Sequence, residues 1–352
     1  MTHRENLLRT LSRSGPQWVP YELGMTPGVY ETFKQKTGQT DPSEYFRLGF
    51  RHIGAGPSRQ KLDHSRYFAG LTLPPGTQID EWGVARRPGS MYHFEKMIHP
   101  MRDLDSVDQV ASYPLPDLDA DYRYDGIAGQ ASKHHDAGYA VIGWAGHIFE
   151  TSWYMRGLDN LLTDMAIRPK LAEAVLERVV RLDEKMAHEV AAAGADVIST
   201  GDDVGTQRGM MMSPSMWREF IKPRLARVCR AAKNANPNVR VYYHSDGNVM
   251  TIVPDLLEAG VDILDPVQPE CMDLGQLVKD YGDCLLYWGT LGTQTTMPFG
   301  RPQDVKAAVR RAVETVGRGG GLVIAPTHVL EPDVPWENIM ALAEVMGELG
   351  HP

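Results

Sequence analysis

The chain has 352 residues, 42% of them hydrophobic and 23% charged, with a formal net charge of −9. This is ordinary globular composition, and because no basic stripe is present, nucleic acid is not an expected partner. No apolar run approaches the roughly 20 residues of a membrane helix, and the N-terminus lacks a signal-peptide core. Three scattered cysteines indicate thiols in a reducing cytoplasm rather than a disulfide framework.

The N-terminal third is poorly periodic. Residues 17–23 predict a first strand, and a second strand is expected somewhere between residues 49 and 84. Residues 25–138 are rich in Pro, Gly, Asp and Arg, which predicts irregular insertions, long loops and a hairpin, folded over the mouth of a barrel.

From Tyr139 onward the chain shows six strand–helix units, in which short runs of Val, Ile, Leu and Tyr alternate with helical periodicity. Ser213-Pro214 predicts a helix start, and Pro223 predicts a kink in that helix. Further helices are expected over 170–194, 248–260 and 273–282, and from Pro302 and Asp333 onward.

This alternation predicts a parallel sheet, and with two more units it closes into an α/β (β/α)8 TIM barrel, with residues 1–352 as one domain. A doubly wound open sheet is the competing architecture. No Gly-x-Gly-x-x-Gly follows a predicted strand, so the dinucleotide-binding version of that sheet lacks its fingerprint.

Polar residues follow the predicted strands directly, at the barrel end where such enzymes place their chemistry. His244 and Asp246 follow one strand and His328 follows the last. Two imidazoles and one carboxylate suit zinc or a similar divalent metal with an open position for substrate. The alternative is that these groups only form hydrogen bonds with one another.

Other strand ends offer acid–base and binding groups. Asp202 and Asp203 are adjacent carboxylates, so one is expected to face the mouth as an acid–base group while the other caps a loop. Glu150 is a general acid, a further ligand, or the partner of Arg156 in a structural salt bridge. The predicted substrate-binding residues are Tyr243, Asp265, Gln268, Trp288 and Gln294.

Five segments resemble the uroporphyrinogen decarboxylase superfamily and its cobalamin-linked methyltransferase branch. They occur in the family's order, and they are residues 194–203, 212–220, 243–248, 260–266 and 324–328. The resemblance implies a (β/α)8 barrel. In that branch zinc is held by a histidine and two cysteines; His244 matches the histidine, whereas Asp246 and His328 stand where the cysteines would be.

The resemblance implies metal-assisted transfer of a methyl group from a small methylated compound, such as a methyl ether, to a corrinoid protein. Replacing thiolates by Asp246 and His328 favours a more Lewis-acidic metal, suited to polarising oxygen. Residues 19–27 contain no arginine, which disfavours decarboxylation of a polyanionic tetrapyrrole. The alternatives are a metal-free decarboxylase or lyase for a small carboxylate, and a non-catalytic ligand-binding barrel. The oligomeric state stays open, with a homodimer as one option.

Overall fold

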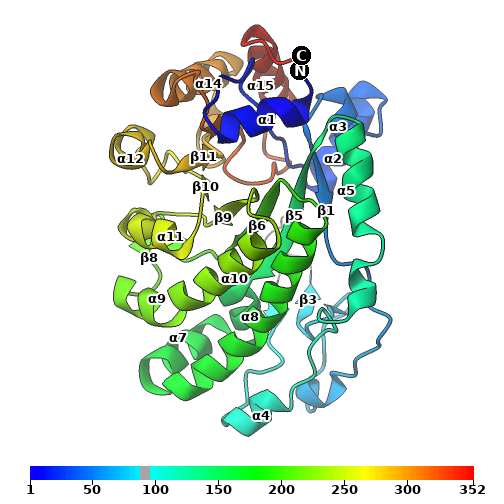
Figure 1. Ribbon diagram of the computed structural model, residues 1–352. Helices are drawn as coiled ribbons and strands as arrows, with labels where there is room; N and C mark the ends of the chain where they lie inside the picture. Colours follow the sequence, from blue (N-terminus) through cyan, green and yellow to red (C-terminus); the bar gives the residue numbers. More distant parts are fainter. Residues whose placement is uncertain (88–95) are drawn as a thin grey trace.

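The computed structural model describes residues 1–87 and 96–352, and its centre is a seven-stranded parallel sheet (Figure 1). The strand order is β1-β5-β6-β9-β10-β11-β12. The strands are β1 (Phe50–Ile53), β5 (Ala140–His147), β6 (Val197–Gly201), β9 (Arg240–His244), β10 (Ile263–Asp265), β11 (Leu286–Trp288) and β12 (Leu322–Val323). The last six are the strands predicted from Tyr139 onward.

The predicted first strand is present only as an isolated bridge. Tyr21 pairs with Ile324 in parallel, and the Glu22 amide donates to the carbonyl of Ile324 at 2.8 Å. This segment therefore lies beside β12. Among the described residues no ladder joins it to β1, so the structure shows a parallel α/β sheet of seven strands and not a fully hydrogen-bonded eight-stranded barrel.

The helices follow the expected alternation with the strands. Ser213 accepts from the Met216 amide as the N-cap of its helix, and the Pro223 region divides two helices that the sequence predicted as one kinked helix. The helices after β5 are α6 (Ile148–Arg156), α7 (Leu158–Ile167), α8 (Pro169–Ala192), α9 (Pro214–Phe220), α10 (Lys222–Ala235), α11 (Val253–Ala259), α12 (Leu274–Tyr281), α13 (Thr296–Phe299), α14 (Pro302–Val316) and α15 (Trp336–Glu348).

The N-terminal third is more regular than the sequence predicts. A three-stranded antiparallel sheet, β2-β3-β4, replaces the expected hairpin, and capped helices occupy several of the expected loops. Most of these elements span five residues or fewer, which is too short to show a period. They are α1 (His3–Leu11), α2 (Pro27–Thr37), α3 (Pro42–Tyr45), β2 (Gln78–Ile79), β3 (Ala85–Arg87), β4 (Lys96–Ile98), α4 (Val107–Ala111) and α5 (Ile127–Asp136). Residues 88–95 of this region lie outside the described residues.

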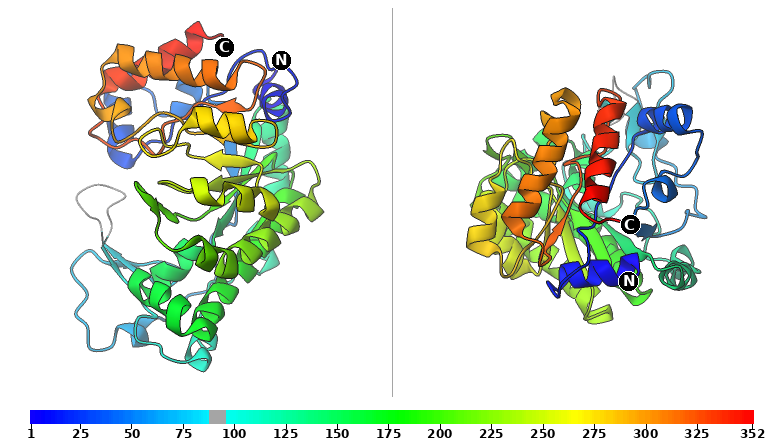
Figure 2. Two further views of the ribbon diagram at one scale, coloured as in Figure 1. Left: turned by 90° about the vertical axis from the view of Figure 1, so that its left-hand side faces the viewer. Right: turned by 90° about the horizontal axis from the view of Figure 1, so that it is seen from above.

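Two apolar clusters lie on opposite faces of the sheet. The larger packs the sheet against the surrounding helices, and the smaller contains inward strand residues such as Ile142, Val197 and Ile263. Leu7 and Leu11 of α1 belong to the smaller cluster, so α1 covers one end of the sheet interior. The two termini lie beside each other, and the segment around β3 and α4 lies at the far end of the molecule (Figure 2).

No helix among the described residues is both long and apolar enough to cross a membrane.

Candidate active site

A cavity of about 300 Å³ opens where the parallel strands end. Segments distant in sequence meet there because the carboxyl ends of the parallel strands lie at the same edge of the sheet. Along each strand, every second side chain faces inward. The lining residues are Glu22, Gly24, Trp144, His147, Ser199, Tyr242, His244, Asp265, Trp288, Ala325, Pro326, Thr327, His328 and Val329. None of these described lining residues is Lys or Arg, so Glu22 and Asp265 supply the negative charge, and positive charge can come only from a histidine.

His244 is the most strongly connected residue of this cavity. It pairs in register with Asp265 on the neighbouring strand, and its Nδ1 lies 2.6 Å from Oδ2 of that residue. Its Nε2 lies 3.7 Å from Oδ1 of Asp203 and 3.9 Å from Oδ1 of Asp246. Burial would lower the pKa of His244, but the hydrogen bond and charge of Asp265 and the two other carboxylates raise it to about 10.

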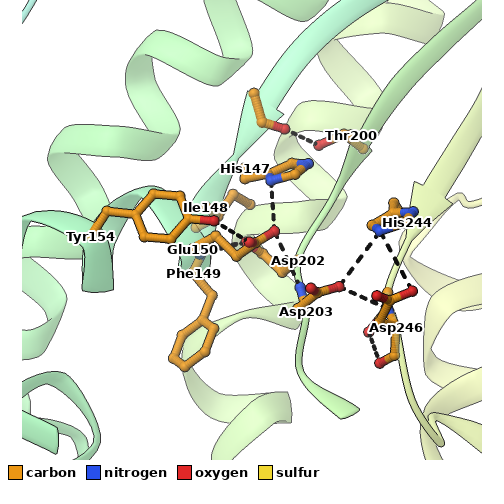
Figure 3. A network of polar contacts seen from close by, with 12 residues as sticks. His147, Ile148, Phe149, Glu150, Tyr154, Thr200, Asp202, Asp203, His244 and Asp246 are labelled. Atoms are coloured by element: carbon orange, nitrogen blue, oxygen red, sulfur yellow. Dashed lines mark hydrogen bonds and ion pairs between the residues drawn. The ribbon is translucent and has the colours of Figure 1, made fainter. Parts of the chain in front are cut away.

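Asp203, His244 and Asp246 fit a divalent metal ion. Each offers one ligand atom, and these atoms all lie within 4.8 Å of one another (Figure 3). Asp265 holds Nδ1, so Nε2 is the nitrogen that faces the two carboxylates, as in carboxylate–histidine–metal arrangements. Burial, together with the charges of Asp203 and other nearby carboxylates, raises the pKa of Asp246 to about 7 despite the opposing charge of His244. Crowded carboxylates of this kind favour a bound cation.

His328 lines the same cavity as His244, so two stretches 84 positions apart do converge on one space. It is not part of the three-residue group, which contains Asp203 instead. Metal binding by His328 therefore stays a prediction.

The two adjacent aspartates separate as the sequence suggested, with one facing the cavity region and one capping. Oδ1 of Asp202 accepts from the backbone amides of Phe149 and Glu150 at 2.5 and 2.9 Å, at the start of α6. Burial raises its pKa well above the usual value of an aspartate. Asp203 instead faces His244 and accepts from the Asp246 amide at 2.7 Å. These two hydrogen bonds place Asp202 at the start of α6, and its acid–base role stays a prediction.

Glu150 connects His147 with Tyr154 (Figure 3). Its Oε2 lies 2.7 Å from Nδ1 of His147, and its Oε1 accepts from the Tyr154 hydroxyl at 2.6 Å. Burial would raise the pKa of Glu150, but the hydrogen bond and charge of His147 lower it to about 2. Arg156, the alternative partner, instead forms an ion pair with Asp164 at 2.8 Å.

Glu22 and Trp288 form a further contact in the cavity. The Trp288 indole donates to Oε2 of Glu22 at 2.8 Å. Burial and the charge of Asp265 raise the pKa of Glu22 to about 7, against the effect of the Trp288 hydrogen bond. Trp288 was predicted to bind substrate, and it does line the cavity; Asp265 lines it too but also orients His244.

The structure places three predicted substrate-binding residues outside this lining. Tyr243 is fully buried in the outer apolar cluster, because strand alternation turns Tyr242 and His244 inward and Tyr243 toward the helices. Gln268 is buried and accepts from the Gly247 amide at 3.0 Å, so it holds the loop after His244. Gln294 is exposed, and its contact with substrate stays a prediction.

Sequence reasoning missed Glu22, Trp144, His147 and Tyr242 as site residues. The signal for Tyr242 was available, since it lies two positions before His244 on a strand. His147 had a different signal, because it directly follows the predicted strand that ends at Gly146. A bulge in β5 pairs Trp144 with Ser199 but His147 with Gly201, so one extra residue turns both aromatic side chains toward the cavity.

A second cavity of about 310 Å³ shares Trp144 and His147 with the first. Its other lining residues are Gly54, Ala55, Glu81, Trp82, Val84, Arg86, Leu118, Arg123, Gly146, Thr151, Tyr154 and Met186. Arg123 pairs with Asp117 and Glu81, and Arg86 with Asp80, so both cations of this cavity are already neutralised.

The family model for uroporphyrinogen decarboxylase (URO-D) matches residues 60–349, and the chain belongs to this family. Methylcobamide:CoM methyltransferase MtaA of Methanosarcina barkeri is 31% identical over 162 residues, which are 46% of this chain and 44% of that protein. Uroporphyrinogen decarboxylase of Xanthomonas axonopodis pv. citri is 25% identical over 375 aligned positions, covering 99% of both chains.

Among solved structures, a methyltransferase from Methanosarcina mazei has a TM-score of 0.72 with this chain. The two share 19% sequence identity, and the match covers 99% of each. This likeness shows a common fold. The named relatives are enzymes of two kinds, and the match covers less than half of MtaA. The relatives therefore do not decide between the two reactions.

Proposed function

We propose that this protein is a methyltransferase that uses a divalent metal ion, zinc being the first candidate, to move a methyl group from a small methylated compound to a corrinoid protein. A methyl ether is the favoured donor. We also propose that the enzyme is cytoplasmic, and a homodimer is one option for its oligomeric state. Its principal support is the group Asp203, His244 and Asp246, held in place by Asp265.

In this proposal His244, Asp246 and Asp203 hold the metal, and His328 approaches from elsewhere in the same cavity. A bound divalent metal with nitrogen and oxygen ligands acts as a Lewis acid that polarises an oxygen of the substrate. Asp265 keeps Nε2 of His244 directed at the carboxylates, and Asp202 fixes the start of α6, which carries Glu150.

The charge of the cavity favours a neutral or cationic donor. Its described lining contains Glu22 and Asp265 but no Lys or Arg, and the His244 imidazole already pairs with Asp265, so a polycarboxylate would find no guanidinium or ammonium group to pair with. The MtaA-type relative adds support for methyl transfer.

The first test is the metal content of the purified protein and of His244→Ala, Asp246→Ala and His328→Ala. We expect about one equivalent of metal in the wild type and a large loss in the first two variants. His188→Gln is a matched control, because His188 contacts Glu189 on the surface of α8 at 3.3 Å. Equal metal content in all the proteins would overturn the metal-dependent proposal.

Decarboxylation of a small carboxylate without a metal is the second candidate. The observation in its favour is that a relative named uroporphyrinogen decarboxylase aligns over 99% of both chains. Release of carbon dioxide from a carboxylated substrate by the metal-free protein would support this candidate, and formation of methylcobalamin from cob(I)alamin would support the first.

A further inference from the structure

His147 ends β5 at the wall between the two cavities. It lines both of them together with Trp144, and the two rings pack with centroids 4.6 Å apart. A group at this wall can touch a ligand that extends from one cavity into the other.

The imidazole of His147 is held from one side only. Oε2 of Glu150 lies 2.7 Å from Nδ1 and also accepts from the Asp203 amide at 3.4 Å. The Tyr154 hydroxyl fixes the other oxygen at 2.6 Å. Within residues 1–87 and 96–352, Nε2 has no hydrogen-bond partner. A carboxylate at Nδ1 keeps a proton on that nitrogen, which leaves Nε2 to exchange a proton with a ligand.

This arrangement differs from the one around His244. Both histidines have a carboxylate at Nδ1, but Nε2 of His244 faces two further carboxylates, whereas His147 has aromatic neighbours. The His244 surroundings suit a cation, and the His147 surroundings suit a proton donor to a ligand atom.

We propose that His147 is a catalytic acid that protonates the oxygen from which the methyl group departs, with Glu150 and Tyr154 as positioning residues. The inference rests on the proposed methyl transfer. The carbon–oxygen bond breaks and its electron pair stays on oxygen, while the methyl group passes to the reduced corrinoid nucleophile of that proposal. The proton moves from Nε2 of His147 to the oxygen, and His147 becomes neutral with its second proton still on Nδ1.

The second cavity is where the departing alcohol lies. Trp82, Trp144 and Tyr154 give it aromatic walls, and its arginines are already paired. An uncharged aromatic alcohol fits these walls, so phenol and its methyl ethers are suitable probes.

The kinetic test compares anisole with 4-nitroanisole as methyl donors to free cob(I)alamin, in the metal-loaded wild type and in His147→Gln. Phenolate needs a proton to leave, whereas 4-nitrophenolate leaves readily without one. With anisole we expect a loss of about 100-fold or more in His147→Gln, the usual contribution of an acid catalyst, and with 4-nitroanisole a loss of less than about tenfold.

Glu150→Gln should show the same dependence on the leaving group with a smaller loss, which a merely structural role would not produce. His188→Gln should match the wild type with both donors, because its His–Glu pair lies on the outer surface. Equal losses for the two ethers in His147→Gln, or no loss, would overturn the proposal.

A binding test does not depend on turnover. In the state left after transfer, the unprotonated Nε2 of His147 accepts the hydroxyl of the product. In mildly alkaline buffer, which favours that state, the wild type should bind phenol about 5- to 10-fold more tightly than anisole, the effect of one hydrogen bond. His147→Leu should lose this preference, and His188→Gln should keep it; calorimetry measures all three.

An absent phenol preference in the wild type, or an unchanged preference in His147→Leu, would overturn the proposal for His147. If the wild type transfers a methyl group from neither ether, the proposed function fails for methyl ethers, and the phenol comparison alone then decides the role of His147.

Discussion

His244 illustrates how one neighbour decides what a histidine can do. Asp265 occupies Nδ1 at 2.6 Å, so the nitrogen that faces Asp203 and Asp246 is fixed rather than free to exchange by a ring flip. Partners of this kind raise the basicity of a ligand and orient it. The sequence assigned Asp265 to substrate binding, because adjacency on neighbouring strands cannot be seen in a linear pattern.

Asp265→Asn should weaken metal binding by about 10- to 100-fold, the usual effect of losing such a partner, without removing any of the three ligands. Competition with a chromogenic chelator measures the change. Asp262→Asn is the control, since that residue pairs with Lys233 at the other end of the strand region. Equal metal affinity of the Asp265 variant and the wild type would show that Asp265 does not orient His244.

Asp183 is a different kind of residue, an acid that the fold buries completely. Neither carboxylate oxygen has a hydrogen-bond partner among the described residues, and burial raises its pKa well above the usual 3.8. The folded protein therefore keeps a proton that the unfolded chain releases above pH 3.8.

Because the folded pKa is the higher one, Asp183 makes stability fall as pH rises from about 4, by about 1.4 kcal/mol per pH unit, until the folded pKa is reached. Asp183→Asn should remove this slope and be more stable than the wild type at pH 7, with little difference at pH 3.5. Urea unfolding at several pH values gives the difference between the two profiles. Parallel profiles would contradict the prediction.

At the scale of elements, the sequence was most informative where a periodic pattern extends over many residues or many strand–helix units. The long helix α8 was predicted because its apolar residues repeat over many positions, and the six strands after Tyr139 because short apolar runs alternate with such helices. Short elements such as β2 and α4 gave no such repeat. Within strands, alternation could have excluded Tyr243 and selected Tyr242, but the bulge that turns His147 inward depends on pairing with β6 and has no sequence pattern.

Gly146 makes this bulge possible. Its φ is +83°, and an added Cβ would collide with Oδ1 of Asp183 and come within 2.7 Å of Cε of Met186. Gly146→Ala should therefore destabilise the fold by about 1–3 kcal/mol, the range for a strained backbone position, and displace His147. Denaturant unfolding tests the first effect and loss of the phenol preference tests the second. Gly129→Ala, in open space on α5, is the control; it should not destabilise the fold and should keep the phenol preference.

At the scale of the whole molecule, residues that stabilise the fold and residues of the candidate site lie at opposite ends of the sheet interior. Leu7 and Leu11 of α1 pack with Phe50, Ala140 and Val197 near the strand starts, whereas His244 and Asp265 lie at strand ends. The overall parallel arrangement could be predicted from the strand–helix alternation. The incomplete closure beside Tyr21 could not, because it depends on how a single bridge is placed.

Leu7→Ala should cost about 2–5 kcal/mol, as for other buried leucines, and leave metal affinity unchanged, because α1 lies beside the strand starts and the ligands lie at the strand ends. Thermal unfolding and chelator competition measure the two quantities on the same samples. Leu8→Ala, on the exposed side of α1, should change neither. A parallel loss of metal affinity in the Leu7 variant would show that the two ends are coupled.

The first cavity brings together Glu22, His244, Asp265 and, beside them, Asp203 and Asp246, without a Lys or Arg in its described lining. The negative potential of these carboxylates attracts cations at a distance and slows the approach of anions. Salt screens this potential, with a screening length of about 10 Å at 0.1 M ionic strength, so the effect is larger in dilute buffer. The association rate of a cation should thus increase as ionic strength falls, whereas the association rate of an uncharged donor should not change.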